Sequence, residues 1–167
     1  MIVISACLGG IACRYDGNDN LVSKIEELLQ RADTILVCPE VLGGLPTPRP
    51  SAEIIGGNGD DVLDGNAKVM TKEGQDVTEA FVLGAYKALE QIKDLNPEYI
   101  ILKERSPSCG SSTIYTGEFN GNKQTGFGVT TALFKRHGFK VISEEEFENT
   151  IGIDPVRQFL FSVLFHT

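Results

Sequence analysis

The sequence predicts an α/β domain with a mainly parallel sheet, because short apolar runs alternate along the chain with helical patterns. Four runs rich in β-branched residues indicate buried strands, and they lie at residues 2–6, 34–37, 99–102 and 140–142. Between these runs, apolar residues recur three and four positions apart, as on one face of a helix. With 167 residues, the chain is long enough for one compact domain and marginal for two, so a single domain over residues 1–167 is expected.

Five helices are expected, each marked by an apolar stripe, a cap or both. The first covers residues 20–32, and one of its faces carries Leu21, Ile25, Leu28, Leu29 and Ala32. The second begins at Asp76, an acidic cap with Glu79 three residues on. Its buried face carries Val77, Phe81, Ala85, Ala88, Leu89 and Ile92. The others are expected at 128–137, from Ser143 with a capping box, and at about 154–166 after an acidic cap and a proline.

Two segments carry turn signals instead of a regular pattern. Residues 43–66 are rich in glycine and proline and are expected to be mostly loop. Residues 112–119 follow the third strand and are expected to form a short irregular hairpin. The chain shows no internal repeat, low-complexity tract or linker, which fits the expectation of one domain.

The composition narrows the class of function. The formal net charge is −8 and no run of Lys and Arg offsets it, so long nucleic acid is not an expected partner, whereas a single base or nucleotide is compatible. No apolar run approaches the ~20 residues that span a bilayer, and no basic segment precedes the apolar N-terminus as in a signal peptide. Residence in the cytoplasm is therefore expected, where cysteines are more often ligands, nucleophiles or core residues than disulfides.

Three cysteines follow three of the predicted strands. Cys7 comes at the end of the first strand, Cys38 at the end of the second, and Cys109 a few residues after the third. Because the carboxyl ends of parallel strands meet at one edge of a sheet, the fold is expected to bring these thiols together. Neighbouring glycines and prolines let the backbone approach a bulky cofactor. We therefore expect an iron–sulfur or metal site, and three cysteines would leave one iron of a [4Fe–4S] cluster open.

The cysteine pattern leaves alternatives open. A free cysteine often only fills a core, which is the better interpretation for any one thiol taken alone. Spacing does not separate an iron–sulfur cluster from zinc, which also binds thiolates. Cys13 is either a fourth ligand, which would close the cluster and favour electron transfer, or a small buried residue in the turn before Arg14.

Polar residues beside the cysteines are candidates for catalysis and substrate binding. Glu40 can act as a general acid or base in a closed pocket, or it caps a turn or pairs with an arginine. Arg49 and Lys103 can offset the charge of a cluster or bind a polar substrate, or they are solvated loop charges. Ser106 and Ser108 can donate hydrogen bonds to sulfur or to a substrate, or they are simple turn residues.

Six segments, taken together and in this order, resemble a known bacterial family. They are Ser5–Leu8, Cys13–Gly17, Cys38–Glu40, Gly43–Arg49, Ser106–Gly110 and Gly126–Thr130. The family was long of unknown function, and its characterised member is a thiouracil desulfurase. The resemblance runs from about Met1 to about Phe147, so the helix expected at 154–166 lies outside it.

The resemblance implies a single Rossmann-like domain with a [4Fe–4S] cluster at the carboxyl ends of the strands. By motif, Cys7, Cys38 and Cys109 correspond to the cluster ligands, and Glu40 and Ser106 to the catalytic positions. The resemblance also implies that the fourth iron takes the sulfur of a small thiolated base or nucleotide. Thiouracil and water then give uracil and hydrogen sulfide without a redox change.

Two positions depart from the family pattern, and other functions stay open. Gly9 replaces a bulkier apolar residue and Phe127 replaces an aspartate, which points to a changed substrate pocket. The alternative from another class is a non-catalytic iron–sulfur or zinc protein, such as a sensor or a carrier of sulfur or iron. A second enzymatic alternative is a cluster-dependent lyase. Iron content and spectroscopy with a thiolated base separate these functions.

Overall fold

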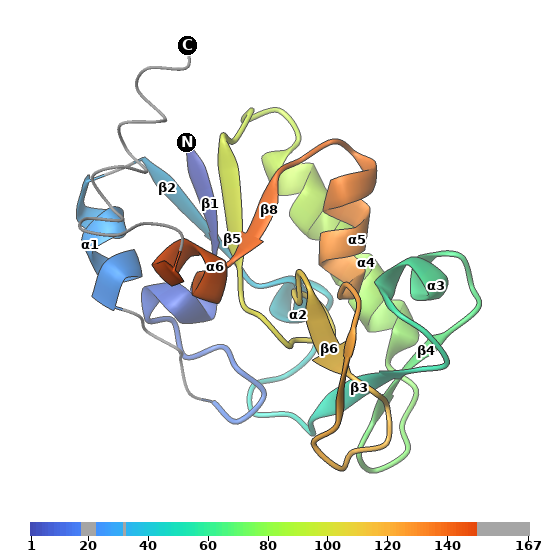
Figure 1. The fold of residues 1–167 in the computed structure, drawn as a ribbon. Helices are drawn as coiled ribbons and strands as arrows, with labels where there is room; N and C mark the ends of the chain where they lie inside the picture. Colours follow the sequence, from blue (N-terminus) through green and yellow to red (C-terminus); the bar gives the residue numbers. More distant parts are fainter. Residues whose placement is uncertain (18–22, 32, 150–167) are drawn as a thin grey trace.

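The computed structural model describes residues 1–17, 23–31 and 33–149 and places helices on both faces of a parallel sheet (Figure 1). The sheet has four strands, β1 (Ile2–Ser5), β2 (Thr34–Val37), β5 (Tyr99–Leu102) and β8 (Val141–Ser143). Their order is β2-β1-β5-β8, and all three pairings are parallel. The four apolar runs therefore form the predicted strands, with ends that differ by one residue at β1 and β8.

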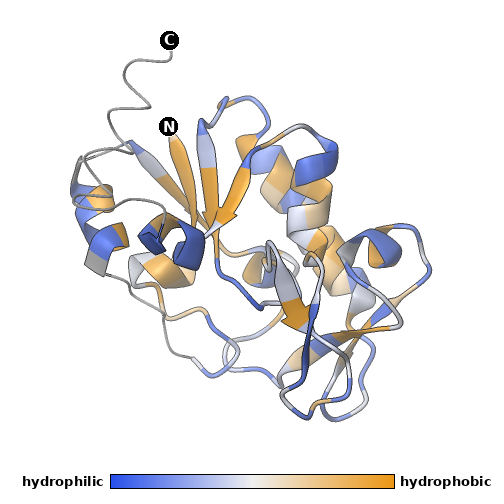
Figure 2. Ribbon diagram, in the orientation of Figure 1, coloured by the Kyte–Doolittle hydropathy of each residue, from blue (hydrophilic) through white to orange (hydrophobic). Residues whose placement is uncertain are grey.

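Each face of the sheet has its own core, because strand side chains alternate between the two faces. One face packs on α4 (Thr78–Ile92) and α5 (Val129–Arg136), and the strand residues buried there include Val3, Ile100 and Leu102. The other face packs on α1 (Ser23–Arg31) and α6 (Glu144–Asn149), and the strand residues buried there include Ile2, Ile4 and Ile101. Figure 2 shows the central strands as strongly hydrophobic ribbons between these helices.

The helices confirm most of the predicted boundaries. In α4 the expected face is buried, and Val77, which precedes its first turn, is half-buried. In α6 the Ser143 hydroxyl accepts the backbone N–H of Glu146 at 2.9 Å, as in the predicted cap. Residues 20–22 and 32 of the first expected helix, and the helix expected at 154–166, lie outside the described residues. No helix among the described residues has the length and apolar composition needed to cross a bilayer.

The segment 43–66 is mostly irregular, as expected, but it also contains two elements that were not predicted. This segment contains β3 (Ala52–Ile55), which pairs antiparallel with β4 (Lys68–Thr71), and α3 (Gly59–Leu63). Asn58 starts α3, and its side chain accepts the backbone N–H of Asp61 while the Asp61 carboxylate accepts the N–H of Asn58. This capping box was readable in the sequence and outweighs the glycines around it.

The hairpin expected at 112–119 is longer than predicted. Its strands are β6 (Thr113–Tyr115) and β7 (Lys123–Thr125), paired antiparallel, so the turn lies between them at 116–122. The second strand has no apolar residue, which is why the pattern gave no sign of it.

A short helix, α2 (Pro39–Leu42), packs closely on α4 through two glycines. A Cβ atom at Gly43 would lie 2.1 Å from the carbonyl oxygen of Ala80, and one at Gly84 would lie 2.0 Å from that of Pro39. Only glycine allows backbones to approach this closely. The contact fixes the segment that begins at Cys38 against the long helix.

Candidate active site

The carboxyl ends of β1, β2 and β5 open onto one cavity of about 530 Å³. The chain leaves β1 for β2 on one side, and β5 lies on the other, so the cavity is at the switch point where open α/β sheets bind ligands. The predicted site residues that line it are Cys7, Cys38, Cys109, Glu40, Arg49, Lys103 and Ser106, and Cys13 joins them. Aromatic side chains that were not predicted to line a site are also there: Tyr15, Phe81, Tyr115 and Phe119.

Each predicted cysteine lies just beyond the strand that positions it. Cys7 is in η1 (Ala6–Gly9), the 3-10 turn after β1, Cys38 directly precedes α2, and Cys109 is in the loop after β5. Cys7 and Cys109 are buried, and Cys38 is partly buried. Cys13 is also buried, and hydrogen bonds link its thiol with Cys38 and Cys7. The fold thus brings all four thiols to one place.

The thiols affect one another because they share a poorly solvated space. A hydrogen bond with Cys13 lowers the pKa of Cys38 to about 7, against the opposing effect of burial. The contacts with Cys38 and Cys7, followed by burial, raise the pKa of Cys13. Burial raises the pKa of Cys109, and the nearby Glu40 carboxylate adds to this effect. The pKa of Cys38 is thus lowered, whereas those of Cys13 and Cys109 are raised.

The donor set is compatible with a multinuclear group. One tetrahedral zinc holds its sulfurs at ~2.3 Å, hence within about 4 Å of one another. In the part of the chain that the structure describes, no three Cys, His, Asp or Glu side chains meet closely enough to hold one ion. Cys7, Cys38 and Cys109 instead reach one cavity from three separate loops. Each can then bind a different iron of a cluster, which fits the expected [4Fe–4S] group.

The Ser106 hydroxyl caps the turn that carries Cys109. Its oxygen accepts the backbone N–H groups of Ser108 and Cys109, each at 3.1 Å. Ser106 lines the cavity, and the described residues offer no acceptor for its own proton. The hydroxyl is therefore held by the loop and is free to donate into the cavity.

The start of α5 holds the same loop from the other side. The backbone N–H groups of Thr130 and Thr131 donate to the carbonyl of Ser108 at 2.8 Å and 3.3 Å. A Cβ atom at Gly128 would lie 2.4 Å from the carbonyl carbon of Ser108, so only glycine permits this contact. The Ser108 side chain is buried, hydrogen-bonds the Thr130 hydroxyl at 2.8 Å and does not line the cavity. Ser108 hydrogen-bonds the thiol of Cys109 and so supports this cysteine, and contact of Ser108 with a substrate stays a prediction.

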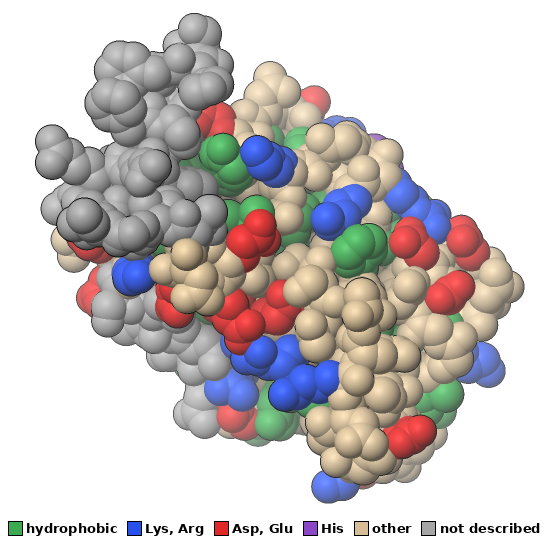
Figure 3. Space-filling model, in the orientation of Figure 1, with side chains coloured by type: hydrophobic (Ala, Val, Ile, Leu, Met, Phe, Trp, Pro, Cys, Tyr) green, Lys and Arg blue, Asp and Glu red, His purple; other side chains and the backbone are tan. Residues whose placement is uncertain are grey.

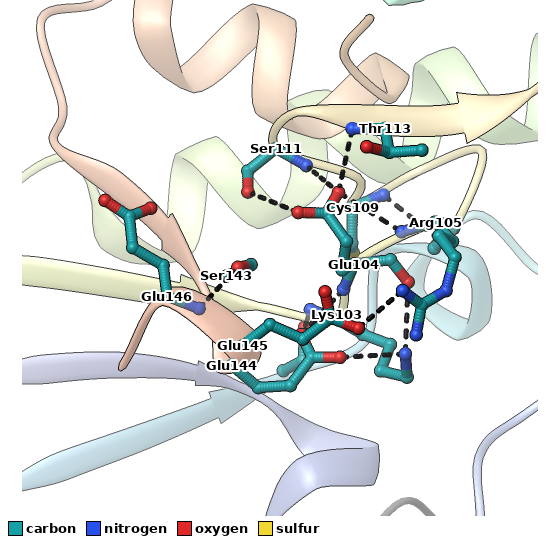
Figure 4. A network of polar contacts seen from close by, with 12 residues as sticks. Lys103, Glu104, Arg105, Cys109, Ser111, Thr113, Ser143, Glu144, Glu145 and Glu146 are labelled. Atoms are coloured by element: carbon teal, nitrogen blue, oxygen red, sulfur yellow. Dashed lines mark hydrogen bonds and ion pairs between the residues drawn. The ribbon is translucent and has the colours of Figure 1, made fainter. Parts of the chain in front are cut away.

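A buried carboxylate, Glu104, organises the segment after β5 (Figure 4). It is 4% exposed and accepts the backbone N–H groups of Arg105, Ser111, Ser112 and Thr113 and both serine hydroxyls. Burial by itself would raise the pKa of Glu104, but these hydrogen bonds outweigh it and lower the pKa below its ordinary value. Glu104 was absent from the predicted site, and the available signal was an acid at a strand end followed by a run of hydroxyl residues.

Glu40 forms an ion pair with Arg49 in the wall of the cavity. The Oε2 atom of Glu40 accepts from both Nε and Nη2 of Arg49, with Nε at 2.9 Å. The Oε1 atom has no partner among the described residues. The other Arg49 donors bind the carbonyl of Pro46 and the hydroxyl of Thr47, both at 3.1 Å, and the carbonyl of Cys13 at 3.0 Å. Every side-chain N–H of Arg49 thus has an acceptor among the described residues, and substrate binding by Arg49 stays a prediction.

Basic and acidic side chains meet at the edge of the cavity. Figure 3 shows Lys and Arg side chains gathered beside Asp and Glu on the face between α6 and β6. The Lys103 Nζ lies 2.8 Å from Glu144, and an Arg105 nitrogen lies 2.5 Å from Glu145. Glu144 is buried and also accepts the backbone N–H of Glu104 at 2.7 Å. Lys103 thus lines the cavity as half of an ion pair, and substrate binding by it stays a prediction.

The two departures from the family pattern lie away from the cavity. A Cβ atom at Gly9 would lie 2.8 Å from the Leu36 side chain, so this glycine packs toward β2. The Phe127 ring lies under Lys135, whose Nζ is 4.6 Å from the ring centroid. Neither residue lines the pocket, contrary to the expectation that Gly9 reshapes its wall.

Comparison with known proteins identifies the family. The Bacillus subtilis (strain 168) protein YbbK, described as uncharacterized, is 52% identical over 151 residues, which are 90% of this chain and 100% of YbbK. A solved structure of the [4Fe-4S]-dependent thiouracil desulfidase TudS is 39% identical, covers 96% of this chain and 97% of its own, and matches with a TM-score of 0.77. Residues 2–146 match the family described as 2-thiouracil desulfurase. The chain therefore belongs to the 2-thiouracil desulfurase family, as its sequence motifs indicate.

Proposed function

We propose that this chain is a [4Fe–4S]-dependent desulfurase, which converts a small thiolated nucleobase or nucleotide, such as thiouracil, and water into the oxo compound and sulfide. The observation that carries the proposal is a convergence on one cavity. Three cysteine-bearing loops, Glu40 and Ser106 all line it, and Oε1 of Glu40 has no partner among the described residues. A sensor or carrier would use the thiols but gives no role to the carboxylate oxygen and the hydroxyl. Family membership and the activity named for the solved relative support the same reading.

Cys7, Cys38 and Cys109 would hold the cluster, one from each loop. Cys13 hydrogen-bonds two of these thiols, and these contacts raise its pKa, so we place it beside the ligands and not among them. When bound, the cluster supplies an iron without a protein ligand, whose affinity for soft sulfur polarises the C–S bond of the substrate.

The chain's own residues supply proton transfer and orientation. The Oε1 atom of Glu40 accepts a proton from water as the water oxygen bonds to the carbon that carries sulfur. Glu40 then returns this proton to the departing sulfur as the C–S bond breaks and sulfur leaves with the bonding electron pair. The second proton of the water, now on the new hydroxyl, also passes to sulfur as the C=O bond forms. Ser106 donates a hydrogen bond to a polar ring atom and holds the ring in place. Oxygen replaces sulfur and hydrogen sulfide departs, so no oxidant or reductant is needed.

Anaerobically reconstituted protein tests the proposal. We expect about four irons per chain and equal amounts of sulfide and uracil from 2-thiouracil. Cluster-free protein from the same preparation is the matched control and should release no sulfide. If iron-loaded protein releases no sulfide from any thiolated base or nucleotide, the sensor or carrier function replaces this one, and a protein that takes up zinc instead of iron points to a zinc-binding domain.

We infer that the protein works in the cytoplasm on a small molecule. The four cysteines are free thiols, which persist in that compartment. The formal net charge of −8 disfavours long nucleic acid as a substrate. The cavity, at about 530 Å³, has the size of a small-molecule site.

A further inference from the structure

We propose that Arg49 is a positioning residue that acts through Glu40: it fixes one carboxylate oxygen, so that the other alone is presented to the substrate. The proposal rests on the proposed function, because it assigns Arg49 a part in the proton transfer by Glu40. It replaces the role of substrate ligand that the sequence suggested.

The guanidinium of Arg49 is fully engaged. An arginine side chain has five N–H donors in a rigid fork. Two of them bind Oε2 of Glu40, and the other three bind the oxygens of Pro46, Thr47 and Cys13. The side chain is 6% exposed. Because every donor has an acceptor and the group is buried, Arg49 cannot turn toward a substrate without breaking several hydrogen bonds.

The pairing distinguishes the two oxygens of Glu40. The terminal torsion of a glutamate is broad and roughly two-fold, so a free carboxylate presents either oxygen. In this structure both bonds from Arg49 go to Oε2, while Oε1 has no partner among the described residues. The Glu40 side chain is 15% exposed and lines the cavity. The clamp therefore sets the direction from which Glu40 takes and gives a proton, a geometry to which rates are sensitive.

Arg49 also ties the carboxylate to the segment that carries Cys13. Its backbone N–H donates to the carbonyl of Tyr15 at 2.6 Å, and its Nη2 donates to the carbonyl of Cys13 at 3.0 Å. Arg49 thus fixes the position of the Glu40 carboxylate relative to the turn at Cys13 and Tyr15, which lies next to the thiols. A lysine has the same charge but no planar fork, so it cannot make this set of bonds.

The test compares Arg49→Met and Arg49→Lys with the wild type, all reconstituted anaerobically. We expect iron content near that of the wild type, a lower melting temperature because a buried ion pair is broken, and kcat reduced roughly 10- to 100-fold with KM little changed. Guanidinium ion at millimolar concentration should restore part of kcat in Arg49→Met. The matched control is Arg136→Met, which removes an arginine paired with Asp60 and Asp64 outside the cavity and should keep its activity without any effect of guanidinium.

Two further measurements separate positioning from binding and from structure. If Arg49 acts through Glu40, the double variant Glu40→Gln/Arg49→Met should be no slower than Glu40→Gln alone. Amide hydrogen exchange at residues 13–15 of the cluster-free protein should be faster in Arg49→Met. A raised KM with unchanged kcat, additive losses in the double variant, or cluster loss without rescue by guanidinium would each overturn the proposal. A wild type that is inactive on every thiolated base and nucleotide would instead reject the proposed function, and the positioning role with it.

Discussion

The side-chain oxygen of Ser106 accepts the backbone N–H of Cys109 at 3.1 Å, so a proposed catalytic residue also shapes the turn that carries a proposed cluster ligand. The same oxygen accepts the N–H of Ser108, also at 3.1 Å. An oxygen that accepts two N–H groups keeps its own proton for a third partner. The turn therefore determines the direction in which the Ser106 hydroxyl donates its hydrogen bond. The Ser106 oxygen in turn stabilises the shape of the turn.

Ser106→Ala should lower turnover by roughly 10-fold, because the orienting hydrogen bond to substrate is lost. Two backbone N–H groups lose their acceptor in the same variant, so its cluster should also bleach faster in air. Ser106→Thr keeps the oxygen and should keep most of both properties. Sulfide release and the decay of the visible absorbance measure the two effects. A Ser106→Ala protein with the wild-type rate would show that the hydroxyl does not touch the substrate.

The four cysteines should respond differently to substitution. Cys7→Ser, Cys38→Ser and Cys109→Ser should each lose the cluster, since each removes one of three ligands from a separate loop. Cys13→Ala should keep about four irons and much of the activity, with at most a loss of stability. Iron and sulfide analysis after anaerobic reconstitution gives the answer. Loss of iron from Cys13→Ala would mean a site closed by four cysteines and no open iron.

Gly84→Ala should destabilise the protein by about 1–3 kcal/mol, as overpacking usually does. In a solvent-exposed helix the same change is favourable by about 1 kcal/mol, so the sign is diagnostic. The reason is the 2.0 Å approach between a Cβ atom at Gly84 and the carbonyl of Pro39. Urea unfolding of cluster-free protein measures the effect, and Leu83→Ala at the exposed neighbouring position is the control. An unchanged midpoint for Gly84→Ala would show that α2 moves away freely.

The sheet could be predicted from the sequence because its strands are short apolar runs, and the two central strands, β1 and β5, are buried on both faces. In runs such as 34–37 and 99–102, four residues are enough to identify a strand. The cysteines that follow these strands therefore lie at the edge of the sheet where the carboxyl ends of the strands meet. The strands β3 and β7 gave no such signal. The first lies in a glycine- and proline-rich stretch and depends on pairing with β4, and the second is polar and depends on pairing with β6. A short stretch of sequence does not show which strand it will pair with, so strands of this kind could not be predicted.

The site was predictable in its thiols but less so in its charges. A cysteine after a strand is placed by the strand, whereas a charged side chain is placed by whichever partner satisfies it. Arg49 has acceptors at Cys13, Glu40 and Thr47, and two of these are remote in the chain. Glu104 gains its role only when the loop after Cys109 folds back over it. These partners determine whether a charged side chain is available to bind a substrate or instead supports the structure of the site.

Glu104 should make stability depend on pH in the acid range. Its pKa is lowered below the ordinary value of 4.5 by hydrogen bonds that outweigh burial, so the folded state favours the charged form. The stabilisation is thus fully present above about pH 5. It is lost as the pH falls through the ordinary value and then through the lower pKa of the folded state.

The comparison of Glu104→Gln with the wild type isolates this effect. At pH 7 the variant should be less stable by about 2 kcal/mol, because an amide has one oxygen fewer to accept the surrounding N–H and O–H groups. The difference should shrink between pH 5 and pH 3 in urea unfolding of cluster-free protein. Glu73→Gln at an exposed position is the control and should show no such trend. A pH-independent difference would show that Glu104 acts by shape and not by charge.

Glu40→Gln should lower sulfide release by roughly 10²-fold or more, as expected for loss of a general acid–base group. The amide oxygen can still accept from Arg49 in the place of Oε2, so the pairing and the fold should survive with the cluster intact. The amide nitrogen then takes the place of Oε1, the atom that has no partner among the described residues, and it cannot accept a proton from water.

The control is Glu53→Gln, which changes a second carboxylate that lines the cavity but accepts the backbone N–H groups of Gly117 and Phe119. Because the amide oxygen of that variant can keep those bonds, its activity should fall less than 10-fold. Equal losses of activity in the two variants, with equal iron content, would mean that the charge of the cavity matters and not the position of Glu40. An unchanged rate in Glu40→Gln would remove this residue from the mechanism.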